Sequence, residues 1–411
     1  MRNVVHPVIC AAALAVVVAA PAWGQGSVGS GPLTKSLTDI EPTTGVISIG
    51  RVRVAPGVVV REIGWDSNVF DEAENPKEDF IVSVAPDAAL FARLRFLQLS
   101  AYAGGDFNHF QTYERENSAG HSLRGRADVL LSRFRPFVGG GRTDSRTRPN
   151  GEIDVRADRV EEELSGGLVF DISRYGQVYG AVYQFKTRFH DAFEDGVNLS
   201  VALNRDSNDY AAGLRTDLTP LLALVASVSF REELFRADPI RNAQSWFATA
   251  DFRFDANAVV AGQVVVSFEE FTPVNPAVQP FRGLVGDASL RYSFLEVGRI
   301  GFSAVRRNEF SFNADDAYYI ENGISLSYTH HLFGDVDAQV KGSRSRFDYG
   351  YTETSPARQE TLDIVGGSVG YNLRNRTRIS VNYEFAKRRS PQLLERNYDR
   401  RRAFLAWNFA Y

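Results

Sequence analysis

The chain of 411 residues has almost no cysteine: the single one is Cys10, which lies in an apolar stretch near the N-terminus. Arg2 precedes this stretch, which runs from about residue 8 to residue 20, and small residues follow it. This pattern is typical of a cleaved secretory signal peptide, which we place at residues 1–24. Cys10 would then be lost on export, and the exported chain could form neither a disulfide framework nor a thiolate zinc site.

The rest of the chain lacks any uninterrupted apolar run of the roughly 20 residues that a membrane-spanning helix needs. It also lacks a basic domain: the net charge is -4 and the arginines are scattered, so we expect no nucleic-acid partner. Aromatic residues make up 12% of the chain, with 29 Phe, and there are 34 Gly. If such a chain lies in a membrane, it crosses as alternating strands, whose hydropathy averages to neutral.

Residues 397–411 show a period of two. One side carries Arg401, Ala403, Leu405, Trp407, Phe409 and Tyr411. In water this apolar strand would be an aggregation-prone edge, but it suits a strand that closes a transmembrane barrel in lipid. Phe409 and Tyr411 also resemble the C-terminal aromatic signal by which outer-membrane proteins are handed to the barrel assembly machinery. We therefore expect the outer membrane of a Gram-negative cell as the location, with its lipid and that machinery as partners.

The same alternation recurs along the mature chain, and the connections alternate between short and long. Short connections fall near residues 92–94, 133–136, 173–176, 217–220, 255–258, 295–299, 330–335 and 374–376. Longer polar stretches separate them, an asymmetry typical of barrels with short periplasmic turns and long extracellular loops. We expect an all-β fold, a transmembrane antiparallel up-and-down β-barrel of about 18 strands, with 16 as the alternative.

Residues 25–51 are rich in Gly, Ser, Thr and Pro, and we interpret them as a flexible periplasmic lead-in to a barrel at residues 52–411. This lead-in is too short for the plug domain of a TonB-dependent transporter. A soluble β-sandwich would also alternate, but here nearly every strand has a polar second face, and aromatic residues gather near strand ends as in membrane-interface girdles. The sequence therefore favours an unplugged membrane barrel.

If the apolar strand faces meet lipid, the opposite faces line the lumen. This criterion selects as candidate lumen residues Tyr102, Arg124, Arg126, Asp128, Arg215, Arg231, Asp251, Arg253, Glu269, Asp287, Arg291, Arg307, Asp337, Lys341, Arg378 and Glu384. Both charge signs occur, so no selectivity ring of one sign is evident. These side chains could form a hydrated path for a polar solute, or they could only pair with one another; the sequence leaves both interpretations open.

Catalytic and metal-binding patterns are scarce. The histidines after the signal peptide lie in no recognisable nucleophile motif. Acidic groups such as Asp315 and Asp316, or Asp191, Glu194 and Asp195, lack the spacing of a dedicated calcium loop, and we interpret them as solvated surface. We therefore expect no enzyme activity, no cofactor and no bound metal.

A first strand near residues 58–63 leads into Gly64, Trp65, Asp66, Ser67, Asn68, Val69 and Phe70. A strand that ends in an aromatic residue, Asp, a small polar residue, Asn, an apolar residue and Phe resembles the opening of the putative β-barrel porin 2 family of outer-membrane proteins. The general layout of the mature chain is similar as well. Asp66 and Asn68 lie where the strand becomes a loop, so we expect their side chains to bond the local backbone.

The resemblance implies an outer-membrane channel. Members of this family are often linked to secretion of exopolysaccharide or capsule, beside a periplasmic polysaccharide export protein, and the family has no catalytic residues. The leading hypothesis is therefore a passive pore for polysaccharide export. A general porin for small polar solutes is the first alternative, and a structural or adhesive barrel with a closed lumen is the second.

Overall fold

The computed structural model describes residues 47–410 apart from 191, 295–296, 353–356 and 374–376. The expected signal peptide, most of the expected lead-in and Tyr411 lie outside the described residues. Within them, no helix is long and apolar enough to cross a membrane. The last residues before the barrel form a short strand, β1 (Ile47–Ile49), which pairs with β2 (Val52–Asp66).

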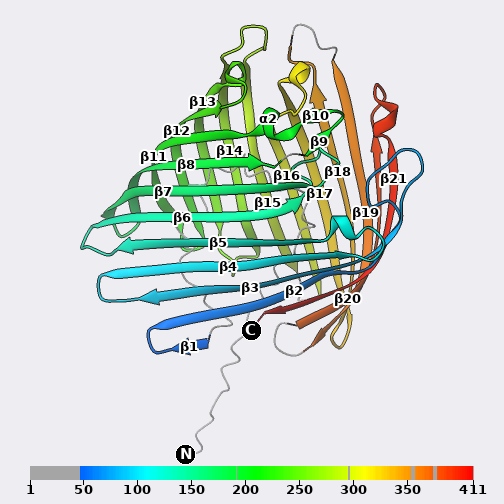
Figure 1. Cartoon of the computed structure of the whole chain (residues 1–411). Coiled ribbons are helices and arrows are strands. Elements are labelled where there is room, and N and C mark those ends of the chain that lie inside the picture. The colour runs from blue at the N-terminus through cyan, green and yellow to red at the C-terminus, as the bar shows by residue number, and fades with distance from the viewer. Residues whose placement is uncertain (1–46, 191, 295–296, 353–356, 374–376, 411) are drawn as a thin grey trace, which may run out of the picture.

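In this part of the chain, eighteen antiparallel strands form a closed barrel. They are β2, β3 (Asp79–Arg93), β4 (Leu97–Phe110), β5 (Ser118–Val129), β6 (Phe134–Thr147), β7 (Ala157–Ser173), β8 (Gly176–Phe189), β11 (Arg205–Thr219), β12 (Leu222–Phe235), β13 (Ala243–Phe254), β14 (Val260–Pro273), β15 (Phe281–Phe294), β16 (Gly298–Phe310), β17 (Tyr318–Phe333), β18 (Val336–Tyr349), β19 (Arg358–Leu373), β20 (Thr377–Arg389) and β21 (Tyr398–Ala410). Each strand pairs with the next, and β21 pairs with β2 (Figure 1). The predicted fold is confirmed, and the strand number is the predicted 18 and not the alternative of 16.

The two rims of the barrel differ as predicted. Strands meet in short turns at one rim, for example at residues 220–221 and 334–335, and in longer loops at the other. The loops contain short elements of their own: η1 (Glu114–Glu116), β9 (Phe193–Glu194), β10 (Val197–Asn198), α2 (Leu199–Leu203), η2 (Pro239–Arg241), η3 (Ala314–Asp316) and η4 (Leu394–Arg396). Figure 1 shows β1 and the C-terminus near the turn rim.

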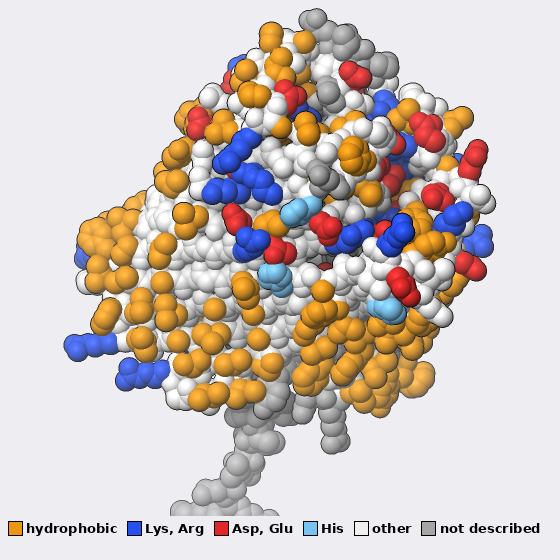
Figure 2. Space-filling model, in the orientation of Figure 1, with side chains coloured by type: hydrophobic (Ala, Val, Ile, Leu, Met, Phe, Trp, Pro, Cys, Tyr) orange, Lys and Arg blue, Asp and Glu red, His pale blue; other side chains and the backbone are white. Residues whose placement is uncertain are grey.

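Side chains alternate between the two faces of the wall, because successive residues of a strand point to opposite sides. The outward face is apolar in the middle of the strands, with exposed side chains such as Val228, Trp246, Leu284, Val365 and Val381. In Figure 2, hydrophobic side chains spread over the lower part of the visible face, and most charged side chains lie above them, toward the loop rim. This is the surface expected of a barrel that crosses a bilayer.

The seam between β2 and β21 has an irregular register. The pairing shifts between Val60 and Ile63, where β2 carries one residue more than β21. A bulge of this kind bends the strand and increases its twist. Beyond it, Gly64 lies so close to β21 that a Cβ atom would overlap the backbone of Ala403 and Phe404. The close approach of the first strand to the last therefore requires glycine at this position.

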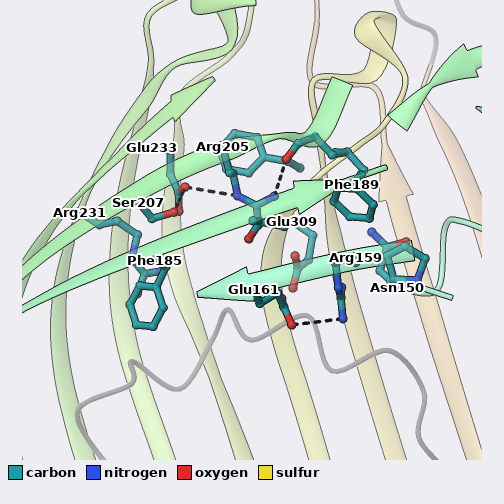
Figure 3. Close-up of a pocket in the computed structure, with 14 residues that line it drawn as sticks. Asn150, Arg159, Glu161, Phe185, Phe189, Arg205, Ser207, Arg231, Glu233 and Glu309 are labelled. Atoms are coloured by element: carbon teal, nitrogen blue, oxygen red, sulfur yellow. Dashed lines mark hydrogen bonds and ion pairs between the residues drawn. The ribbon is translucent and has the colours of Figure 1, made fainter. Parts of the chain in front are cut away.

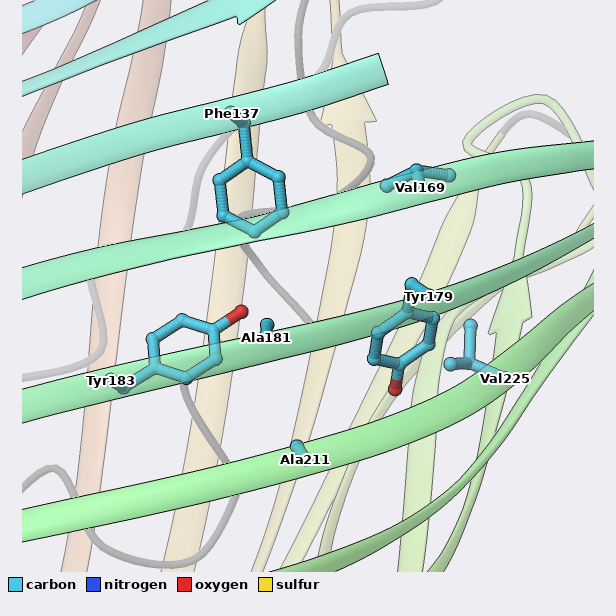
Figure 4. Packing of buried hydrophobic residues seen from close by; sticks show 7 residues of the cluster. All are labelled: Phe137, Val169, Tyr179, Ala181, Tyr183, Ala211 and Val225. Atoms are coloured by element: carbon cyan, nitrogen blue, oxygen red, sulfur yellow. The ribbon is translucent and has the colours of Figure 1, made fainter. Parts of the chain in front are cut away.

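One sector of the inward face is apolar. Five neighbouring strands, β6, β7, β8, β11 and β12, contribute the buried side chains Phe137, Val169, Tyr179, Ala181, Tyr183, Ala211 and Val225 (Figure 4). Cross-strand pairs of aromatic and β-branched residues stabilise a sheet. This packing supports the wall sector from which the loop between β6 and β7 departs.

Candidate functional site

The loop between β6 and β7, residues 148–156, crosses the lumen, and we call it the bridging loop. β6 and β7 are the fifth and sixth of the eighteen strands. Glu152 of this loop bonds Ser311, which lies between the thirteenth and fourteenth strands, β16 and β17. Gly151 lies against Phe347 on β18, the fifteenth strand. The fifteenth strand is halfway around the barrel from the sixth, so the loop reaches the opposite wall.

Local bonds and an apolar anchor shape the tip of the bridging loop. The side-chain oxygen of Asn150 accepts hydrogen bonds from the backbone N–H groups of Glu152 at 2.9 Å and Ile153 at 3.1 Å. Asn favours turns because it can make such bonds. Ile153 is wholly buried and packs in a cluster with Leu199 and Phe312. The hydrophobic effect therefore holds the tip inside the barrel.

Glu152 attaches the tip to the far wall. Its buried carboxylate accepts hydrogen bonds from the Ser311 hydroxyl at 2.6 Å and from the backbone N–H of Phe312 at 3.2 Å, and Arg396 donates to its backbone carbonyl. Burial raises the pKa of Glu152 to about 7, against the lowering effects of the Ser311 hydrogen bond and the Arg396 charge. Ionisation of Glu152 therefore weakens the attachment of the bridging loop to the opposite wall.

Asp154 connects the bridging loop to a buried ion network. Arg388 on β20 donates to Asp154 at 2.9 Å and to Glu360 on β19 at 2.6 Å. The side chains of Arg388 and Glu360 are only 1% and 0% exposed. Arg396 lies 3.8 Å from Asp154, and Arg358 lies 3.3 Å from Glu360. We call these five residues the mouth network. Arg388, Glu360 and Arg396 are buried, so removal of a partner from one of them would leave an uncompensated charge in the interior.

Two acidic residues that the sequence analysis interprets as solvated surface are buried, so that interpretation is wrong for them. Glu194 accepts hydrogen bonds from the backbone N–H groups of Asp154 at 3.1 Å and Val155 at 2.9 Å. Asp316 lies 3.3 Å from Arg358 of the mouth network. Burial, followed by the negative charge of Asp154, raises the pKa of Glu194. Both residues are structural parts of the loop rim.

Arginine residues hold the two ends of the bridging loop. Arg148 and Arg156 both donate to the backbone carbonyl of Val69, each at 2.9 Å. Arg148 also lies 3.1 Å from the carboxylate of Asp71. Val69 and Asp71 belong to the loop that follows β2, so the first loop of the barrel supports the bridging loop.

The opening motif is bonded locally, as predicted. Asp66 accepts a hydrogen bond from the backbone N–H of Asn68 at 3.0 Å. Asn68 in turn donates to the carbonyl of Glu72 at 2.8 Å and accepts from its N–H at 3.0 Å. Arg400 on β21 binds Asp66 and lies 3.3 Å from Asp71. The motif therefore joins the last strand to the first at the loop rim.

The candidate lumen residues all lie on strands, on the face opposite the exposed apolar side chains. Several form ion pairs between residues i and i+2 of one strand, as Arg126 does with Asp128 at 2.6 Å. Arg253–Asp251 at 2.7 Å and Arg215–Asp217 at 3.4 Å are pairs of the same kind. The pairs that join different strands are Arg231–Asp209 at 2.8 Å, Arg307–Glu321 at 3.5 Å, Lys341–Glu384 at 2.5 Å and Arg378–Asp337 at 2.6 Å. Eleven of the fifteen charged candidates thus take part in these ion pairs.

For the remaining candidates, the structure gives a hydrogen bond to a neutral side chain or a position in the strand register. Glu269 accepts a hydrogen bond from the Ser245 hydroxyl at 3.4 Å. Tyr102 on β4 and Arg124 on β5 lie opposite each other in the ladder. Asp287 and Arg291 share the inward face of β15.

A pocket opens beside the bridging loop (Figure 3). Asn150 and the inward side chains of β7, β8, β11, β12 and β16 line it. Arg159 lies 3.4 Å from Glu161, and Arg205 lies 3.4 Å from Glu233. Its charged lining comprises Arg159, Arg205, Arg231, Glu161, Glu233 and Glu309, equal numbers of each sign, beside the rings of Phe185, Phe189 and Phe310. The charged lining of this pocket is therefore balanced in sign.

Sequence reasoning did not single out the bridging loop or the mouth network. Arg388 continues the inward face of Arg378 and Glu384, so the period of two could have placed it inward. The side chains of Glu152 and Asp154 gave no local signal, because their partners Ser311 and Arg388 lie 159 and 234 residues away. In the described residues, no group of three or more His, Asp or Glu is placed to hold a metal ion.

The chain is similar to one protein family and to several solved structures. No curated protein matches the chain. Among solved structures, it is similar to OccAB3 of Acinetobacter baumannii, with 11% identity and a TM-score of 0.48 over 87% of this chain and 99% of that one. OpdO of Pseudomonas aeruginosa is 12% identical, with a TM-score of 0.49 over 87% of this chain and 97% of that one. OpdK of the same organism is 8% identical, with a TM-score of 0.48 over 87% of this chain and 99% of that one. A family model described as putative beta-barrel porin 2 matches residues 45–410, so the chain belongs to that family of outer-membrane porins.

Proposed function

We propose that the protein is a diffusion channel for small polar solutes, in which the bridging loop sets the size limit near the extracellular mouth. The observation that carries this proposal is the attachment of the loop to the opposite wall, through Glu152 and Asp154. A loop held across the lumen reduces the cross-section that is open to a solute. Solutes that fit beside the loop pass, whereas larger ones are excluded.

The lumen charges define the second part of the proposal. We propose that the candidate lumen residues line the solute path, and that their pairing keeps the field in the lumen weak. Pairs such as Lys341–Glu384 and Arg378–Asp337 present both donors and acceptors without a net charge of one sign. Neutral or zwitterionic solutes are therefore favoured over small ions of either sign.

Polysaccharide export, which the family resemblance implies, is the rival function. A hydrated glycan chain needs a wide and continuous passage, so export requires the bridging loop to leave the lumen. That movement would separate Arg388 from Asp154 and Ser311 from Glu152. A periplasmic polysaccharide export protein would have to supply the driving force. The proposed signal peptide at residues 1–24 would direct this chain across the inner membrane, and Phe409 and Tyr411 would direct its assembly in the outer membrane.

Liposome swelling tests the proposal against this rival. We expect proteoliposomes to swell rapidly with monosaccharides and amino acids and about tenfold more slowly with tetrasaccharides, because the bridging loop narrows the path. Deletion of the gene should leave surface polysaccharide unchanged. A strain that loses its surface polysaccharide, together with liposomes that do not swell with any small solute, would contradict the proposal and support export.

Raising the pH should widen the channel by releasing the bridging loop. The neutral form of Glu152 is favoured while the loop is attached to the opposite wall, because its pKa there is about 7 and its ordinary value is 4.5. The contribution of Glu152 to the stability of the attached loop is fully present below about pH 4.5 and is lost as the pH rises through about 7. We expect single-channel conductance to rise across this window in the wild type and to stay flat in Glu152→Gln, which keeps a neutral, hydrogen-bonding side chain. Parallel pH profiles of the two proteins would contradict this mechanism.

A further inference from the structure

We propose that the outer wall of β16 to β21 binds the phosphate groups of lipopolysaccharide, the phosphorylated glycolipid of the outer leaflet. The site consists of outward-facing basic side chains near the loop rim, and we call it the outer basic surface: Arg306, Arg344, Arg346, Lys387, Arg389 and Arg401. It lies outside the barrel and is independent of the solute path.

Strand register places three of these arginines in one row. Arg306 pairs with Asn322, and Asn322 pairs with Arg346. Arg346 then pairs with Thr361, which pairs with Arg389. Successive arginines of this row are two strands apart, and neighbouring strands are about 5 Å apart, so the arginine backbones are about 10 Å from each other. The row contains no carboxylate, and its two intervening residues, Asn322 and Thr361, can donate hydrogen bonds.

A second row runs parallel to the first, one outward position closer to the membrane. Arg344 pairs with Asp363, Asp363 pairs with Lys387, and Lys387 pairs with Asp399. Arg344 binds Asp363 through two hydrogen bonds, at 2.6 and 3.0 Å. Its side chain nevertheless remains 68% exposed. This row is charge-balanced, so the excess of positive charge comes from the first row and from Arg401.

The acidic residues of this surface do not neutralise it. Asp348 binds Arg346 at 3.0 Å, and Asp363 and Asp399 belong to the second row. Six cations therefore face three carboxylates. The wall of β6 to β12 differs: there Arg142 binds both Asp144 and Glu162, and Arg188 and Arg236 share Asp206. The excess of positive charge is a local property of one side of the barrel.

The height of the surface matches a lipid headgroup. On the same outward face, exposed apolar side chains begin at the second row and continue toward the turn rim. Ile324 pairs with Arg344 in that row, Val365 is the next outward residue after Asp363 on β19, and Val340 lies two outward positions beyond Arg344 on β18. The basic rows thus begin where the apolar band ends, on the loop side of the barrel. In outer-membrane barrels this side faces the outer leaflet. A guanidinium suits phosphate because it can donate two parallel hydrogen bonds, and basic clusters at this level attract anionic headgroups.

Binding of purified lipid A in detergent, followed by native mass spectrometry, tests the proposal. The variant Arg306→Gln/Arg346→Gln/Arg389→Gln should bind bisphosphorylated lipid A about tenfold more weakly than the wild type, since three surface cations are removed. The matched control Arg142→Gln/Arg188→Gln/Arg236→Gln removes three arginines from the opposite wall and should change binding by less than about twofold. Each protein should first show the heat-modifiable gel mobility of a folded barrel.

Two further arms identify the ligand. Dephosphorylated lipid A should bind the wild type as weakly as bisphosphorylated lipid A binds the triple variant, and millimolar inorganic phosphate should not displace the lipid. Equal loss of binding in the triple variant and its control would overturn the proposal, because it would indicate general charge attraction. Full binding of dephosphorylated lipid would overturn it as well. The triple variant should conduct like the wild type, which separates this result from the channel function.

Discussion

Replacing residues 149–154 of the bridging loop with two glycines should raise the single-channel conductance about twofold or more, because the lumen then lacks the segment that reduces its open cross-section. The size limit in liposome swelling should rise in parallel. The replacement removes Glu152, Ile153 and Asp154, and with them the attachments to Ser311 and Arg388. Conductance in planar bilayers measures the first effect directly.

A shortened loop elsewhere serves as the matched control. Residues 274–277 belong to the loop between β14 and β15, and three of the four are exposed. Their hydrogen bonds go to Asn242 and to their own loop, so replacing them with two glycines shortens an extracellular loop without removing a contact of the bridging loop or the mouth network. Conductance of this control should match the wild type. If neither the wild type nor the bridging-loop variant conducts, the barrel has a closed lumen, and a structural or adhesive role is favoured.

Arg388→Met should be the most destabilising single substitution at the mouth. It removes the guanidinium that is hydrogen-bonded to both the buried carboxylate of Glu360 and Asp154, and loss of one partner from a buried pair costs about 3–5 kcal/mol. Met keeps much of the side-chain volume, so the effect reports charge and hydrogen bonding. Urea unfolding in phosphatidylcholine vesicles, followed by tryptophan fluorescence, measures the free energy of unfolding. The same variant should conduct more than the wild type, because Asp154 is released.

Two companion variants make this measurement specific. Arg344→Met breaks an exposed ion pair whose hydrogen bonds to Asp363, at 2.6 and 3.0 Å, are as short as those of Arg388. Because solvent screens that pair, its loss should lower the free energy of unfolding far less than the loss of Arg388 does. The double variant Arg388→Met/Glu360→Gln should recover part of the lost stability, since it removes the orphaned charge. Equal costs for Arg388→Met and Arg344→Met would contradict the burial argument.

The barrel could be predicted from the sequence because its determinants are local. A period of two fixes which side chains share a face, and turn residues at short intervals fix where each strand ends. Arg126 and Asp128, two residues apart on β5, therefore share the inward face and form an ion pair. The opening motif was predictable for the same reason, because Asp66 bonds the backbone of Asn68, two residues away.

The bridging loop could not be predicted, because its conformation depends on contacts between distant parts of the chain. In the sequence, residues 148–156 are one polar loop among several. Arg388 lies 234 residues from Asp154, and Arg396 lies 244 residues from Glu152. Such pairs form only once the barrel has closed and brought β20 and β21 beside the mouth. Ile153 and Val155 were local clues, since apolar residues in a polar loop need partners to bury them.

Reversible cross-linking of the bridging loop tests the central claim most directly. The pair Glu152→Cys/Ser311→Cys, with Cys10→Ala, places two thiols where the native side chains touch at 2.6 Å. A short cleavable thiol reagent should cross-link them in intact outer membranes. The cross-linked channel should conduct like the wild type, and cleavage should raise its conductance, because the native attachment is then missing. Failure of the two cysteines to cross-link, or equal currents before and after cleavage, would contradict a loop that spans the lumen and limits passage.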